Sequence, residues 1–165
     1  MPNNKGVIII FTTDPPEQLL KTGPGGFPAF LRLHEADMIY SKRPWADYMR
    51  GKFKEHGILQ QNIFLAADIP ERYGYKLISG EKHTTDRNTI LRICLAAEFT
   101  LEETQEALIL YGMAPLYWRI PRDAAFIVAF HNRIYDIHDV DDILRKNDLP
   151  PFLLDEGKKH PVTTE

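Results

Sequence analysis

Apolar residues recur every three or four positions over most of the chain from Phe27 onward, and this spacing predicts a series of amphipathic helices. Prolines and glycines separate the segments, because proline fits a first helical turn and glycine allows the left-handed conformation that ends a helix. The predicted helices are one from Phe27 that ends before Pro44, then 44–56, 59–67, 70–80, one that begins after Thr84 or Thr85, and 100–112, 121–134 and 138–147.

One short segment departs from the helical pattern. Val7–Phe11 is apolar and rich in β-branched residues, and it lies between Gly6 and Asp14-Pro15-Pro16, which predicts a strand. A single strand leaves its backbone groups unpaired, so it either pairs with the same segment of a second copy or is no strand and packs as an apolar arm. The run Gly23–Gly26 predicts a flexible joint. The predicted fold class is all-α with an N-terminal arm.

Polar side chains at the predicted helix ends indicate how the helices begin. Thr100 and Glu103 fit a capping box, in which the hydroxyl caps the helix and the carboxylate reaches back. Thr84 or Thr85 is expected to cap the helix before it, and the acidic run 136–142 to cap the last one. The spacing predicts no internal repeat at the periods of solenoid proteins. The stripe expected to face the core is Ile90, Ile93, Cys94 and Ala97.

Length and composition narrow the class of protein. The chain has 165 residues, of which 44% are hydrophobic and 26% charged, so it is long enough for one compact domain and is not a disordered chain. The net charge of −3 argues against a protein that coats nucleic acid through bulk charge, although it is compatible with a local basic face.

The remaining composition bears on compartment and chemistry. A single cysteine permits no intrachain disulfide, and the apolar run Val7–Phe11 is too short for a membrane span, so we expect a soluble cytoplasmic protein without a membrane partner. His131, His138 and Asp139 lack the spacing of metal ligands, and no nucleophile and base can be assembled. We therefore expect no metal, no cofactor and no enzymatic activity.

The most informative stretch joins two of the predicted helices by three residues, Asp68-Ile69-Pro70. A connection this tight makes the second helix cross the first at a steep angle, as in a helix-turn-helix. Other residues in and around these two helices belong to the same pattern. They are Gln60, Tyr73, Leu77, the run Ser79-Gly80-Glu81-Lys82, Thr89–Ala97 and Phe99–Glu103.

On these residues the chain resembles the lambda-repressor/Cro-like (XRE) helix-turn-helix family. Leu116-Tyr117 and Arg122–Ala125 look like a C-terminal helical extension of one bacterial subset of such regulators. The resemblance implies an arm and short helix over 1–43, a five-helix DNA-binding domain over 44–112, an extension with two more helices over 113–154, and a flexible tail over 155–165. It implies a transcriptional regulator that reads double-stranded DNA in the major groove with the helix at about 70–79.

The resemblance also assigns roles to side chains. Outward positions of the recognition helix would contact base edges, and these are Glu71, Arg72, Tyr75 and Lys76. Phosphate contacts are expected from the starts of the neighbouring helices and the loop between them, at Gln60, Gln61, Ser79, Lys82, His83, Thr84, Thr85 and Arg87. Residues 50–92 carry eight basic and five acidic side chains, which is only weakly basic, so we expect a homodimer on a two-fold site.

Three positions depart from the family pattern. Phe64 replaces a small residue and Gly74 replaces a branched apolar one, so the two are expected to face each other, with the ring filling the space that glycine leaves. Leu59 stands where a capping hydroxyl is usual, so the helix after it is expected to begin at a different residue.

Other interpretations stay open on the sequence. Arg72 and Lys76 are equally compatible with solvated charges or with ion pairs to Glu71. The negative net charge, Glu71 and Gly74 favour a rival function, in which the same fold is a protein-interaction adaptor that does not bind DNA. A regulator that senses a small molecule in its C-terminal helices is a third, because that region holds Tyr117 and Trp118.

Overall fold

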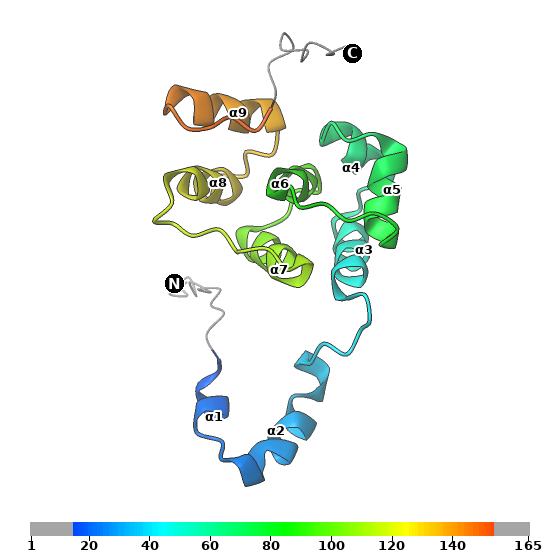
Figure 1. The fold of residues 1–165 in the computed structure, drawn as a ribbon, viewed down its shortest axis with the longest axis vertical. Coiled ribbons are helices and arrows are strands. Elements are labelled where there is room, and N and C mark those ends of the chain that lie inside the picture. Colours follow the sequence, from blue (N-terminus) through cyan, green and yellow to red (C-terminus); the bar gives the residue numbers. More distant parts are fainter. Residues whose placement is uncertain (1–14, 154–165) are drawn as a thin grey trace, which may run out of the picture. The chain divides into compact units, whose positions relative to one another are not determined.

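The computed structural model describes residues 15–153 (Figure 1). Every regular element in that range is helical, which confirms the all-α class for the described residues. The strand or arm predicted at Val7–Phe11 and the tail predicted at 155–165 lie outside them. The chain divides into two compact units, one up to Lys42 and one from Arg43 onward.

The first unit contains short helices. The four-residue α1 (Glu17–Leu20) is followed by a 3₁₀ turn at Pro24–Gly26, by α2 (Phe27–Leu33) and by a second 3₁₀ turn at Glu35–Asp37. The glycine-rich run predicted as a joint thus includes a helical turn that leads directly into α2. The helix predicted to run from Phe27 toward Pro44 is shorter than expected, because it ends at Leu33, the chain turns at His34 and Met38 is extended.

The second unit contains seven helices among its described residues. These are α3 (Pro44–His56), α4 (Gln60–Ala66), α5 (Glu71–Ser79), α6 (Arg87–Ala96), α7 (Leu101–Tyr111), α8 (Pro121–His131) and α9 (Ile137–Lys146). Their bounds lie close to those predicted, except that α8 ends before Ile134 because Arg133 adopts a left-handed backbone. Leu59 precedes α4 without a side-chain cap.

The core of the second unit is one cluster of buried side chains to which each of the helices from α3 to α9 contributes. α3 packs on α5 and α7, α4 packs on α5 and α6, and α6 packs on α7 (Figure 1). The predicted stripe on α6 is confirmed, because all four of its side chains are fully buried: Ile90, Ile93, Cys94 and Ala97.

The helix caps differ in part from those predicted. The Thr100 hydroxyl accepts a hydrogen bond from the backbone N–H of Glu103, but the Glu103 carboxylate does not complete the box. It lies 2.6 Å from Nε2 of His56 instead, which ties α7 to the end of α3. The cap of α6 is Asp86 rather than Thr84 or Thr85. The prediction that the acidic run caps α9 is confirmed, because Asp136 accepts from the N–H of His138.

The pairs α6–α7 and α8–α9 form an approximate internal repeat of two copies, with corresponding residues at their helix starts and turns. Arg87 begins α6 and Arg122 stands 35 residues later at the start of α8. Both pairs turn through a left-handed residue after their first helix, Glu98 and Arg133, at φ 56° in each case. Left-handed residues also follow the second helices, at Gly112 and Asp148.

The hydrogen bonds of the two pairs correspond as well. The Nε atom of Arg87 donates to the carbonyl of Ala114 at 3.1 Å, and that of Arg122 donates to Pro150 at 2.9 Å. The two arginines also cross over between the pairs: Arg87 binds Asp123 at the start of α8, and Arg122 binds Asn88 at the start of α6. Each pair thus binds the start of the other.

Candidate nucleic-acid interface

The interface is built on the close approach of α4 and α5. A Cβ atom placed on Gly74 would lie 2.5 Å from Cγ of Phe64, so the phenyl ring occupies the space that a side chain at 74 would need. Phe64, Gly74 and the joint residue Ile69 are all buried. The expectation that positions 64 and 74 face each other is confirmed, and this contact fixes how α5 lies across α4.

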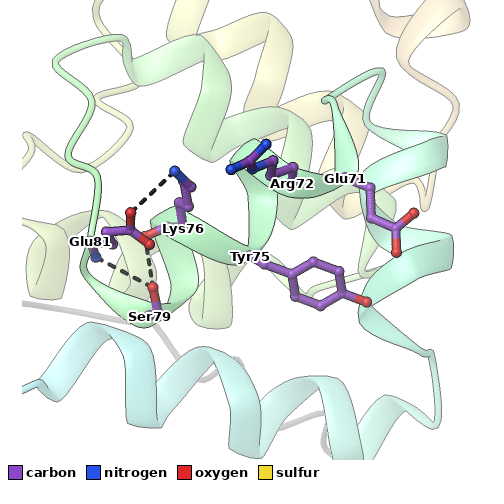
Figure 2. A pocket seen from close by; sticks show the side chains of 6 residues that line it. All are labelled: Glu71, Arg72, Tyr75, Lys76, Ser79 and Glu81. Atoms are coloured by element: carbon purple, nitrogen blue, oxygen red, sulfur yellow. Dashed lines mark hydrogen bonds and ion pairs between the residues drawn. The ribbon is translucent and has the colours of Figure 1, made fainter.

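The outward face of α5 carries the four side chains predicted to contact bases. Glu71, Arg72 and Tyr75 are exposed, and Figure 2 shows them projecting from the helix on the side of an open groove. The ring of Tyr75 also meets the ring of Phe64 edge-to-face, with centroids 5.2 Å apart. Tyr75 is 42% exposed, so it is positioned by Phe64 while most of its outer edge is accessible.

Lys76 is less available for contact with DNA than Glu71, Arg72 and Tyr75. Its Nζ lies 3.1 Å from a carboxylate oxygen of Glu81, and its side chain is 27% exposed (Figure 2). The Ser79 hydroxyl donates to the carbonyl of Lys76 and accepts from the N–H of Glu81, so Ser79 stabilises the turn after α5. The structure thus pairs Lys76 with Glu81, and not with Glu71. The groove lined by these residues carries two cationic and two anionic side chains.

Two residues predicted as phosphate contacts are engaged inside the protein. Arg87 makes two short contacts to Asp123, at 2.7 and 3.0 Å, and donates to the carbonyls of Ala114 and Pro115. Thr84 is 8% exposed, and its hydroxyl accepts from the N–H of Asp86. Because Arg87 is bound to partners within the fold and Thr84 is buried, neither is placed to contact a DNA phosphate.

The start of α6 is occupied by a carboxylate of the chain itself. Asp86 accepts hydrogen bonds from the backbone N–H of Asn88 and from the hydroxyl of Thr89, each at 3.0 Å. A helix N-terminus attracts one anion, and here Asp86 supplies it. A DNA phosphate would therefore be repelled from this position.

The other predicted phosphate contacts lie at the surface. Gln61 is exposed and Gln60 half-buried at the start of α4, and Lys82 and Thr85 are exposed in the loop between α5 and α6. His83 lies in the same loop, where its ring stacks on that of Tyr111 with centroids 4.8 Å apart.

Two arginines that the sequence did not single out hold the C-terminal end of α5. Arg43 donates to the carbonyl of Ser79 at 3.2 Å, and Arg50 donates to that of Ile78 at 3.3 Å. Cations are favourable at a helix C-terminus, where carbonyls lack partners within the helix. No local pattern identifies these contacts, since the arginines lie about 30 residues away in the chain.

Comparison of the chain with protein-family models, with curated proteins and with solved structures finds no match. The resemblance to lambda-repressor/Cro-like proteins therefore stays a prediction from residue pattern and helix spacing. Within residues 15–153, no group of three or more His, Cys, Asp or Glu side chains is placed to hold a metal ion. No helix in the same range is long and apolar enough to cross a membrane.

Proposed function

We propose that this protein is a sequence-specific regulator of transcription that binds the major groove of double-stranded DNA through α5. The observation that supports the proposal most is the outer face of α5, where Arg72 and Tyr75 stand exposed on a helix fixed by the Phe64–Gly74 contact. Readout of bases needs such a preorganised helix whose side chains no other part of the domain covers.

The roles of the side chains follow from their chemistry. The Arg72 guanidinium can donate two hydrogen bonds to guanine, and Tyr75 can contact a thymine methyl group. Glu71 can accept from the amino group of cytosine, whereas Lys76 would have to exchange Glu81 for a base or phosphate. Phosphate contacts are then left to Gln60, Gln61, Lys82, His83 and Thr85, whereas Ser79 would have to give up its hydrogen bonds within the turn.

The dimer that such binding calls for has a candidate surface on α8 and α9. An apolar groove there is lined by Pro121, Ala124, Ala125, Val128, Ile143, Asn147 and Leu149. Val128 is 51% exposed, while Ile93, which occupies the corresponding place in the α6–α7 pair, is fully buried. In the first pair, α3 and α4 pack on α7 and α6. We propose that a second copy of the chain covers the equivalent face of the second pair.

The test is selection of bound fragments from a random pool of duplex DNA, followed by fluorescence polarisation at several salt concentrations. Wild-type protein is expected to enrich one two-fold sequence and to bind it more weakly as salt rises. Arg72→Ala should weaken binding by about 1–3 kcal/mol and relax the preference at one base pair of each half-site. Arg119→Ala, an exposed arginine in the α7–α8 loop, is the control and should change little. Absence of any enriched sequence would overturn the proposal.

One set of observations favours the rival function, a protein-interaction adaptor. The Lys76–Glu81 ion pair, Glu71 on the recognition face and Asp86 at the start of α6 together leave little positive charge where DNA would bind. If no duplex is enriched, but Tyr75→Ala abolishes capture of one defined protein partner, the adaptor is correct and DNA binding is not.

A further inference from the structure

A second recess in the same unit lies apart from the face of α5. It opens between the start of α3, the C-terminal end of α5 with the loop after it, and the end of α7, and its volume is about 300 Å³. That size is at the lower end of the range for small-molecule sites. The lining residues that bear on its chemistry are Arg43, Trp45, Leu77, Lys82, His83 and Tyr111.

Three aromatic rings form one ordered wall of this recess. Tyr111 stacks on His83 with the rings 4° from parallel, and it meets Trp45 edge-to-face at a centroid distance of 4.8 Å. The Tyr111 Oη accepts from the backbone N–H of Thr84 at 2.7 Å, which leaves the phenolic proton able to donate. Burial raises the pKa of Tyr111, so the phenol stays protonated. A flat apolar group would find preformed stacking partners here.

The charge of the lining has one sign. Arg43 and Lys82 are the charged residues of the lining, His83 adds ring nitrogens that can form hydrogen bonds, and no acidic side chain lines the recess. Arg43 is held in place, since it donates to the carbonyl of Ser79. The groove on α5 differs, because it contains two glutamates. A recess with cationic groups and no carboxylate of its own favours an anion.

One residue of the lining carries a buried donor without a partner. The indole Nε1 of Trp45 is buried and has no hydrogen-bond partner among the described residues, and Trp45 as a whole is only 6% exposed. Buried N–H groups are nearly always paired, because an unpaired one forfeits its hydrogen bond to water. The Nε1 atom is closed off from the recess as well, so the ligand chemistry is argued from the rings and the charge of the lining.

We propose that this recess, named the Trp45 recess, binds a small organic anion that has a planar apolar body. The body packs against Trp45, Tyr111 and Leu77, and the anionic group lies near Lys82 and His83. The apolar lining favours such a molecule over a backbone phosphate of DNA, whose sugar neighbours are polar. The recess includes none of the predicted base-contacting side chains, but it shares Lys82 and His83 with the predicted phosphate contacts.

The experiment uses the full chain with Trp118→Phe, which leaves Trp45 as the one remaining tryptophan. Its emission is followed while benzoate, benzamide or inorganic phosphate is added. Benzoate should give a saturable change, and benzamide, which is flat but neutral, should bind at least about tenfold more weakly. Inorganic phosphate should also bind at least about tenfold more weakly than benzoate, since it has no apolar body.

Two lysine variants locate the site. In the Trp118→Phe background, Lys82→Ala should weaken benzoate binding about five- to tenfold, while Lys54→Ala, which removes an exposed lysine at the far end of α3, should leave it unchanged. The proposal fails if benzoate gives no saturable change, if benzamide binds equally well, or if Lys82→Ala has no effect. Equal binding of inorganic phosphate would also overturn it and would assign the recess to simple anions, DNA phosphates included. None of these measurements uses DNA, so their outcome tests the Trp45 recess separately from the proposed function.

Discussion

Phe64 of α4 and Gly74 of α5 share a single space, because a Cβ on Gly74 would lie 2.5 Å from both Cγ and Cδ1 of the phenyl ring. The ring is fully buried and has no room to move away. The pattern of the family that the sequence resembles would instead have a small residue on the first helix and a branched one on the second. The Phe64–Gly74 contact makes the orientation of the candidate recognition helix depend on one aromatic side chain.

Phe64→Ala should therefore lower the free energy of unfolding by about 3–5 kcal/mol, through lost burial and the cavity that remains. Gly74→Ala should also destabilise the protein, although alanine favours helices, because its methyl group overlaps the ring. The double variant Phe64→Ala with Gly74→Val should recover part of the loss. Urea denaturation measures all three, with the exposed Leu65→Ala as a control near zero. A near-neutral Phe64→Ala would contradict the packing described.

The two arginines of the internal repeat should contribute unequally to stability. Arg87 binds the carboxylate of Asp123, whose side chain is only 3% exposed. Arg122 binds the neutral side chain of Asn88 in the other helix pair. Hydrogen bonds to charged groups are worth more than neutral ones, and loss of Arg87 would leave Asp123 without its ion pair. We expect Arg87→Ala to cost about 2–3 kcal/mol and Arg122→Ala about 1 kcal/mol in thermal or urea denaturation. Equal costs would show that the charge of Asp123 does not matter.

Stability should depend on pH through Asp141, which fastens the end of the second repeat. Burial acts to raise its pKa, but hydrogen bonds from Arg145 and from the N–H groups of Leu153 and Phe152 outweigh it and lower the pKa. A lowered pKa in the folded state gives stability that is complete above the unfolded value of about 3.9 and is lost as pH falls through the folded value.

Asp141→Asn should thus cost about 1–3 kcal/mol at neutral pH, and the difference from wild type should shrink below about pH 4. Urea denaturation at neutral and acidic pH measures the difference in unfolding free energy between the variant and wild type under each condition. Asp142→Asn, on the exposed neighbour, should show no such pattern. A difference between wild type and Asp141→Asn that is constant with pH would mean that ionisation of Asp141 does not stabilise the fold.

The thiol of Cys94 should be unreactive in the folded protein. Cys94 is fully buried on α6, and burial raises its pKa despite a hydrogen bond with Thr104. The thiolate is the reactive form, and it is scarce in such an environment. A disulfide reagent that yields a coloured product should label the protein only in denaturant. Rapid labelling under native conditions would show that α6 opens readily.

The helices themselves could be predicted because their signals are local. Pro44 at the first turn of α3 and the left-handed Gly57, Gly80 and Gly112 after α3, α5 and α7 each act within a few residues. The apolar stripe of α6 likewise needs only the helical period. The exposed face of α5 could be predicted from the same helical period, because it lies opposite the apolar side chains that are buried.

The internal repeat could not be predicted from the sequence, because equivalent positions in its two halves make corresponding hydrogen bonds and turns with different residue types. Gln105 exchanges hydrogen bonds with the backbone of Leu116, and at the equivalent place Asp141 accepts from that of Phe152. A left-handed glycine in one half corresponds to a left-handed aspartate in the other, at residues 112 and 148. Similarity of backbone geometry with so little identity of side chains is visible only in three dimensions.

The sequence alone determined that this chain forms short helices, where most of them begin and end, and which faces are apolar, because these properties depend on residues within one or two turns. Tertiary structure decided which polar groups are available at the surface. Arg87 and Thr84 are engaged internally, Glu103 binds His56 instead of its own helix start, and Lys76 pairs with Glu81. A charged side chain binds whichever partner the fold brings within about 3 Å, and the position of that partner is not encoded in the local pattern.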